Sequence, residues 1–473
     1  EFWGHTFYDW EEIVAPNSLS EGLWDERSAF AGLSIDYKRF NSDSMLQNYI
    51  DERDAIRKYD KEAVITTNLM GTYKELDYFK WAKEMDIVSW DNYPAYNTPW
   101  SLTAMRHDLM RGLKDAPFLL MEQTPSQQNW QPYNLLKRPG EVRRLSYQAM
   151  AHGADTCLFF QMRQSVAGQE KFHGAIISHS GREDTRVFRE SSVLGAELAH
   201  IGDTFLNGRT PARVGILFDW NNWWALELSS GPSKDMDYLK TVSLYYETLY
   251  RQNIGVDFLP FEAELEKYDL VIAPMIYMEK NNIGEKLNAY VKNGGTLVTT
   301  VMSGLADEND RCVFGAYPGK LKDMLGIWVE ETDALRPYEQ NHMKIEKADM
   351  VSREEYSCDF LCDIIHPEGG AEVLATYEDD FYAGIPCVTC NTFGKGKAYY
   401  IGTQPEQKFL EELMEKICKD CNIESVYSAD EGVELTVRKS DKGRIVFVIN
   451  HNSKEAEVDF GTDKLKSLID ERK

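Results

Sequence analysis

The chain has 473 residues and a formal net charge of −25, with 43% apolar and 12% aromatic residues. This length predicts about two to four domains, each with its own hydrophobic core. A strongly acidic chain repels nucleic acid and anionic lipid, which argues against both as partners, and the absence of any run of about 18 apolar residues argues against a membrane span.

From residue 44 to about 206, helical and strand-like segments alternate. Helical periodicity marks 44–59, 73–85, 100–114, 141–154 and 184–201. Short apolar or β-branched runs mark strands at 63–69, 86–94, 117–123 and 156–163. Strands that alternate with helices predict βα units around a parallel sheet.

Polar residues stand at or near the ends of three of these predicted strands: Asp91 and Tyr93, then Glu122, then Gln161 and Arg163. Such a row at the carboxyl ends of parallel strands is typical of the active face of a (β/α)₈ barrel. Four βα units are visible, so residues 1–208 are predicted to form the C-terminal half of a TIM barrel. The first residues of the chain are then predicted to be the loop that follows the βα unit before these four.

A new alternation of strands and helices begins near residue 207. Strands at 213–219, 255–260, 268–277 and 295–301 alternate with helices at 236–254 and 284–294, which predicts a flavodoxin-like α/β domain over 209–422. Its Trp-rich segment "WNNWW", from residue 220, is predicted to be a loop at a subunit contact. From 423 to 473, alternating strands predict a small antiparallel β domain that breaks off before its last strand.

The eight cysteines raise the question of a metal site. Six of them form close pairs: Cys358 and Cys362, Cys387 and Cys390, Cys418 and Cys421. No histidine stands near the last two pairs at the spacing of a zinc finger. We therefore expect buried, reduced thiols without a metal or cofactor, which favours a reducing, cytoplasmic compartment. The chain begins at Glu1 rather than at a methionine, so a signal peptide upstream of Glu1 stays an alternative.

Glu122 is the first candidate for chemistry, because a carboxylate at the end of a barrel strand can act as nucleophile, general acid or general base. A structural glutamate paired with a basic side chain is the alternative. Trp130 suits the apolar face of a sugar ring, or else a core position. Glu170 and His173, in a glycine-bounded loop, suit sugar hydroxyls, and with His179 and Asp184 they complete no known zinc spacing.

These stretches form a recognisable pattern. "LLMEQTPSQQNWQPYN", "RRLSYQAMAHGAD", "GQEKFHGAIISHSG", "VGILFDWNNWWALE" and "YDLVIAPMIY" closely resemble glycoside hydrolase family 42, the β-galactosidases, and the resemblance covers nearly the whole chain. It implies a (β/α)₈ barrel, a flavodoxin-like trimerisation domain and a small β domain. It also implies hydrolysis of terminal non-reducing β-D-galactosides with retention of configuration, and a homotrimer.

Carried over motif by motif, the resemblance implies that Glu122 is the catalytic nucleophile. The residues implied to contact substrate are Trp130, Glu170 and His173 around the galactosyl ring, Tyr93 with Asp91 nearby, and Trp3 at the leaving-group subsite. An amidotransferase role for the second domain is disfavoured, since Met302, Ser303 and Gly304 follow its strand where a nucleophilic cysteine is needed.

A retaining mechanism also needs a second carboxyl, about 5 Å from the nucleophile. The resemblance implies an Asn-Glu-Tyr-like motif for it, and none stands upstream of Trp3. We therefore expect this chain to lack the acid/base glutamate. Two alternatives stay open: a catalytically incomplete fragment that binds galactosides or forms trimers, and an α-L-arabinopyranosidase of the same family.

Overall fold

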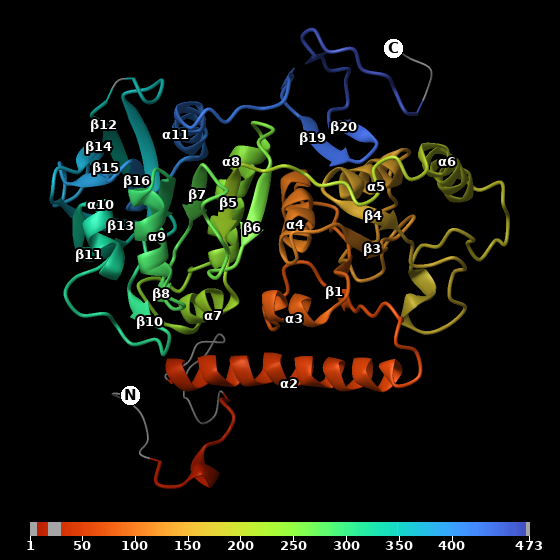
Figure 1. The fold of residues 1–473 in the computed structure, drawn as a ribbon, viewed down its shortest axis with the longest axis horizontal. Coiled ribbons are helices and arrows are strands. Elements are labelled where there is room, and N and C mark those ends of the chain that lie inside the picture. Colours follow the sequence, from red (N-terminus) through yellow and green to blue (C-terminus); the bar gives the residue numbers. More distant parts are fainter. Residues whose placement is uncertain (1–6, 18–29, 348, 470–473) are drawn as a thin grey trace.

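The computed structural model describes residues 7–17, 30–347 and 349–469, and Figure 1 shows their arrangement. Trp3 lies outside the described residues. In the first part, four parallel strands pair in chain order, as predicted. They are β1 (Asn68–Leu69), β2 (Ser89–Asp91), β3 (Phe118–Glu122) and β4 (Ala154–Cys157). Helices α3 (Tyr78–Glu84), α4 (Trp100–Gly112), α5 (Glu141–Ala151) and α6 (Arg186–Ile201) follow these strands in turn.

Two predicted boundaries in this part are wrong. β1 is much shorter than 63–69, because side chains take the backbone bonds before it: Asp86 accepts from the Ile65 amide at 2.7 Å and Thr66 Oγ1 donates to the Ile87 carbonyl at 2.7 Å. Helix α2 (Ala31–Arg57) begins well before residue 44. Figure 1 shows α2 lying beneath both the first part and the second domain.

The second domain contains five parallel strands in the spatial order β6-β5-β7-β9-β16. They are β5 (Val214–Leu217), β6 (Val256–Leu259), β7 (Leu270–Ala273), β9 (Thr296–Thr300) and β16 (Gly396–Ile401). Numbered along the chain, this order is 2-1-3-4-5, the order of flavodoxin, which confirms the predicted topology. Helices α8 (Tyr238–Tyr250), α9 (Ile283–Lys292) and α11 (Gln407–Asp420) belong to this domain, and two short parallel strands, β8 (Met278–Glu279) and β10 (Ala306–Asp307), pair beside it.

An antiparallel extension of this sheet was not predicted. It is inserted between β9 and β16 and continues past β16 in space. Its strands are β11 (Ile327–Ala334), β12 (Asn341–Ile345), β13 (Glu355–Pro367), β14 (Glu372–Tyr377) and β15 (Pro386–Phe393), and β17 (Thr403–Pro405) pairs with β13. The short helix α10 (Lys322–Leu325) precedes them.

The Trp-rich segment is a helix, α7 (Trp220–Leu228), so the prediction of a loop at a subunit contact is wrong. Asp219 caps it by accepting from the Asn222 amide at 2.8 Å. All three indoles are buried. Trp220 Nε1 donates to the Tyr73 carbonyl at 2.9 Å and Trp224 Nε1 to the Lys74 carbonyl at 2.6 Å. The tryptophans therefore join the second domain to the first part.

The C-terminal part forms the predicted antiparallel hairpin, β19 (Val433–Ser440) with β20 (Gly443–Asn450). A second pair, β18 (Ser428–Ala429) with β21 (Val458–Asp459), stands beside it in sequence. Phe447 and Ile449 of β20 share a hydrophobic cluster with Tyr147 and Met150 of α5. The hairpin therefore packs on the first part of the chain, as Figure 1 shows.

All eight cysteines are free thiols, and most are buried, whereas Cys312 is exposed. Within the described ranges, no group of three or more histidine, cysteine or acidic side chains is placed to hold a metal ion. A search of the same residues finds no helix with the length and apolar character needed to cross a bilayer.

Candidate active site

Glu122 ends β3, where its neighbour in the sheet is Asp91 at the end of β2. Each oxygen of its carboxylate accepts one hydrogen bond. The Tyr93 hydroxyl donates to Oε2 at 2.8 Å, and the Asn68 amide donates to Oε1 at 3.1 Å. Burial and then the bond to Glu122 raise the pKa of Tyr93 well above its usual value, so this phenol stays protonated and donates. The carboxylate is thus held from two sides at the carboxyl edge of the sheet.

Asp91 places a second carboxyl beside Glu122. Burial and then the Glu122 charge raise its pKa to about 7, and the Asn68 amide acts in the opposite sense. Near neutral pH, Asp91 therefore carries a proton for much of the time. A protonated Asp91 spares Glu122 the repulsion of an adjacent negative charge.

His173 lies against Tyr93, with ring centroids 5.6 Å apart in a T-shaped arrangement. Its Nδ1 is 2.9 Å from Asn129 Oδ1, which can only accept, so Nδ1 carries the proton. Burial lowers the pKa of His173, and Lys137 contributes in the same direction. The neutral ring therefore leaves Nε2 as an acceptor.

The loop after β3 is fixed by a bond within itself and by bonds to the neighbouring loops. Gln128 Nε2 donates to the Pro94 carbonyl at 2.8 Å, and the buried Lys137 ammonium donates to the Ser126 carbonyl at 3.0 Å. The Gly174 amide donates to the Gln127 carbonyl at 2.7 Å. A Cβ on Gly174 would lie 2.8 Å from the Ser126 Cβ, so only glycine allows this approach. The site is therefore built on loops whose backbones are tied together.

The structure brings Glu122, Tyr93, Asp91 and His173 together, and their roles stay predictions. Glu170 lies in the 3₁₀ turn Gln169–Phe172, and its carbonyl accepts the His173 amide at 2.9 Å. Trp130 follows Asn129 but is 62% exposed, and no ring contact with Tyr93 or His173 is found.

Sequence reasoning missed two site residues. Asn68 stands one residue before the end of the first strand, so a search for polar residues near strand ends, like the one that singled out Asp91 and Glu122, would also have found it. Asn129 stands beside Trp130 in an irregular loop, and no periodic pattern marks it.

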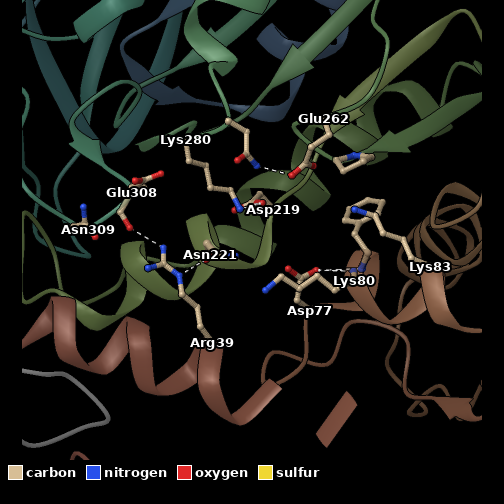
Figure 2. A pocket seen from close by; sticks show the side chains of 13 residues that line it. Arg39, Asp77, Lys80, Lys83, Asp219, Asn221, Glu262, Lys280, Glu308 and Asn309 are labelled. Atoms are coloured by element: carbon tan, nitrogen blue, oxygen red, sulfur yellow. Dashed lines mark hydrogen bonds and ion pairs between the residues drawn. The ribbon is translucent and has the colours of Figure 1, made fainter. Parts of the chain in front are cut away.

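A cavity of about 350 Å³ lies elsewhere, between α2, α3 and the second domain. Figure 2 shows the charged side chains that line it. Several have polar partners: Lys280 Nζ is 2.6 Å from Asp219 and Arg39 donates to Asn221 at 2.6 Å, both within the lining, whereas Lys80 pairs at 2.9 Å with Asp43, which lies outside it. Glu122 and Tyr93 do not line this cavity.

Comparison with protein-family models gives matches to three consecutive domains. Residues 1–201 match the β-galactosidase domain, 212–424 the β-galactosidase trimerisation domain, and 432–473 the β-galactosidase C-terminal domain. The chain belongs to the glycoside hydrolase family 42 β-galactosidases. These domain matches follow the same order as the three parts of the fold.

Named relatives and solved structures agree with this family. β-Galactosidase BgaP of Planococcus sp. (strain L4) is 53% identical over 469 residues, which are 99% of this chain and 69% of the relative. The crystal structure of β-galactosidase from Bacillus circulans sp. alkalophilus superposes with a TM-score of 0.97 at 51% identity, covering 100% of this chain and 70% of that one. Gan42B, a family 42 β-galactosidase, gives a TM-score of 0.93 at 36% identity, covering 100% and 69%. The names of these relatives support a glycosidase.

Proposed function

We propose that the protein is a retaining β-galactosidase in which Glu122 is the nucleophile. The observation that carries this proposal is the carboxylate at the end of β3, held by the Tyr93 hydroxyl and the Asn68 amide. These two bonds orient the group before substrate arrives, and such preorganisation lowers the barrier to attack. A solved Gan42B variant, described as a catalytic mutant, replaces a glutamate with alanine, which fits a catalytic carboxylate in this family.

In the proposed reaction, a Glu122 oxygen attacks the anomeric carbon while the bond to the leaving oxygen breaks. The leaving oxygen takes a proton from the acid/base carboxyl that a retaining mechanism requires, which is predicted to be absent from this chain, and a galactosyl ester forms on Glu122. Water then attacks the same carbon and gives a proton to that acid/base carboxylate, while the ester bond breaks to return the Glu122 carboxylate. As the ester forms, Glu122 loses its negative charge, which removes the charge that raises the pKa of Asp91.

The neighbouring residues are proposed to bind the galactosyl ring. His173, neutral and tied to Asn129, offers Nε2 as an acceptor for a sugar hydroxyl. Glu170 is proposed as a second acceptor and Trp130 as a stacking surface. Trp3 is proposed to border the leaving-group subsite. Terminal β-D-galactosides are the proposed substrates because the relatives are named β-galactosidases.

We further propose that the four βα units of residues 1–208 form part of a (β/α)₈ barrel and that the chain assembles as a homotrimer. The parallel order of β1 to β4 supports the first point, and the match of residues 212–424 to a trimerisation domain supports the second. That the acid/base glutamate is absent from this chain stays a prediction.

Covalent labelling tests the proposed nucleophile without depending on the acid/base group. The reagent is a fluorinated galactoside with a dinitrophenolate leaving group, which departs without a proton. We expect the protein mass to rise by one fluorogalactosyl group, and peptide mapping to place that group on Glu122. The matching fluorinated glucoside, which differs in one hydroxyl, should label more slowly. A label on another acid contradicts the assignment, and no label favours the galactoside-binding alternative.

Replacing Tyr93 with phenylalanine should slow this labelling by about 10- to 100-fold, because a hydrogen bond to a charged group contributes about 1.5–3 kcal/mol. The nucleophile itself stays in place, so the label should still map to Glu122. Tyr96→Phe is the matched control, since Tyr96 is exposed on the loop that follows β2. Equal labelling rates for the two variants would show that the Tyr93 hydroxyl does not orient the nucleophile.

A further inference from the structure

Glu434, near the start of β19, carries a carboxylate that is buried where all three parts of the chain meet. Its side chain is 2% exposed. Four side chains lie within bonding distance: His152 Nε2 at 2.9 Å, Gln148 Nε2 at 2.8 Å, the Tyr250 hydroxyl at 2.6 Å and His451 Nε2 at 2.8 Å. Gln148 belongs to α5 and His152 follows it directly, Tyr250 ends α8, and His451 follows β20. One C-terminal carboxylate therefore contacts all three parts.

His152 is held between two carboxylates. Its Nδ1 is 2.8 Å from Asp108 Oδ1 of α4, and its Nε2 is 2.9 Å from Glu434 Oε1. Ionised carboxylates only accept hydrogen bonds, so both ring nitrogens must donate, and the ring is an imidazolium. Burial alone lowers the pKa of His152, but the charges of Asp108 and Glu434 outweigh it and raise this pKa to about 9.

The other groups around His152 fix this charge state. Asp108 also accepts from Arg111, which bonds Asp257 at 3.1 Å, and from the Tyr246 hydroxyl at 2.6 Å. Burial and the charge of His152 lower the pKa of His107 to about 3, so this ring is neutral. His152 itself contacts His107 and Asp108 on α4 and Glu434 on β19. The charged and titratable groups that act on these partners are Arg111 on α4, Tyr246 and Tyr250 on α8, His451, Arg144 on α5 and, through Arg111, Asp257 on β6.

Helix α5 connects this cluster to the candidate active site. Gln123, the residue after Glu122, donates from Nε2 to Ser146 Oγ of α5 at 2.6 Å. Ser146 and Gln148 stand two residues apart on the same helix, and both side chains are buried. Gln123 Nε2 also lies 2.7 Å from Cys157 Sγ of β4. A displacement of α5 away from the C-terminal domain would therefore move one of the two side-chain partners of Gln123.

We propose that Glu434 is a positioning residue. It holds helix α5 in place through the His152 imidazolium and the Gln148 amide. From this place on α5, Ser146 binds Gln123, the residue beside Glu122. The C-terminal β domain thereby supports the strand that carries the proposed nucleophile. The inference rests on the proposed function for the role of Glu122, whereas the contacts themselves do not depend on it.

Hydrogen exchange on the full chain tests this proposal without using activity. In Glu434→Gln, the neutral amide cannot replace the charge that balances His152. We expect exchange protection of α5 and of 117–123, corrected for intrinsic rates, to fall about tenfold or more, as loss of a charged hydrogen bond implies. Glu431→Gln is the control, because that side chain is 92% exposed three residues away, and it should leave both segments unchanged.

We expect the hairpin to stay docked in Glu434→Gln, because Arg438, a second buried side chain of β19, still bonds Asp155 at 2.6 Å. A loss of protection in α5 can then be assigned to Glu434 itself. If protection falls only in β19 and β20, Glu434 is a structural anchor of the hairpin and the positioning role is wrong. A failure of Glu122 to become labelled would leave this exchange result readable, so the two proposals fail separately.

The pH dependence identifies the titrating group. A raised histidine pKa stabilises the folded state fully below about 6.5, and this stabilisation is lost as the pH rises through about 9. Protection of 117–123 in the natural chain should therefore decline in a step near pH 9. In His152→Gln, the protection should be lower at neutral pH and should show no such step. A step that persists in His152→Gln would overturn the role of the imidazolium.

Discussion

Replacing Glu122 with glutamine is expected to slow covalent labelling by the activated fluorogalactoside on the order of 10⁴-fold or more, the size of loss found when a covalent mechanism loses its nucleophile. A neutral amide matches the carboxylate in shape but has far less electron density to share with the anomeric carbon. The fold should persist, because the side chain is partly exposed and an amide can still accept from Tyr93. Stopped-flow release of dinitrophenolate measures this rate.

A smaller substitution separates loss of the nucleophile from disturbance of the site. In Glu122→Ala, added azide can occupy the space of the carboxylate and attack the same carbon, which should restore dinitrophenolate release and give a galactosyl azide of inverted configuration. Asp91→Asn is the matched comparison at the neighbouring strand end and should lose much less rate. If Asp91→Asn proved inactive while Glu122→Gln was still labelled, the roles of the two carboxyls would be reversed.

Replacing Arg438 with methionine should destabilise the docked C-terminal hairpin by about 3–5 kcal/mol, the typical cost of removing one partner from a buried ion pair. The Arg438 side chain is 0% exposed and bonds Asp155 at 2.6 Å, the Ala154 carbonyl at 2.8 Å and the Gly208 carbonyl at 3.0 Å. Methionine fills similar volume but leaves Asp155 and both carbonyls without this donor.

Exchange protection of the β19 and β20 amides reads this loss directly, because a three-part chain need not unfold in one step. Arg444→Met on the same hairpin is the control, since Arg444 is 41% exposed and stands 3.7 Å from Asp463. An exposed pair of this kind contributes about 0–1 kcal/mol. Equal effects of the two substitutions would mean that Arg438 does not anchor the hairpin.

Local patterns in the sequence predicted much of the fold. The βα alternation of the first part and the flavodoxin-like order of the second domain follow from hydrophobic periodicity, and the strand-end pattern singled out Asp91, Tyr93 and Glu122. Helix α7 was mistaken for a loop because it is buried on nearly all sides, so its sequence lacks the polar face that marks a surface helix.

Contacts between segments that are distant in the sequence could not be predicted, because no local sequence pattern marks them. His152 and Glu434 bond across 282 positions, and neither residue stands in a pattern that predicts burial of a charge. Asn129 orients His173 from a loop 44 positions away. The antiparallel strands β11 to β15 were not predicted, because they are inserted in the sequence between β9 and β16, two strands of the parallel domain.

The indoles of α7 have a consequence for how the first part and the second domain can move. They fill the junction between the first part and the second domain with close-packed rings, and their N–H groups bond backbone carbonyls across it. Close-packed rings resist separation, so we expect the first part and the second domain to move together. In the proposed function, Tyr93, Trp130 and His173 stand on the loops that follow β2, β3 and β4, so grafting these loops from a relative is a direct way to test whether they set which glycoside is accepted.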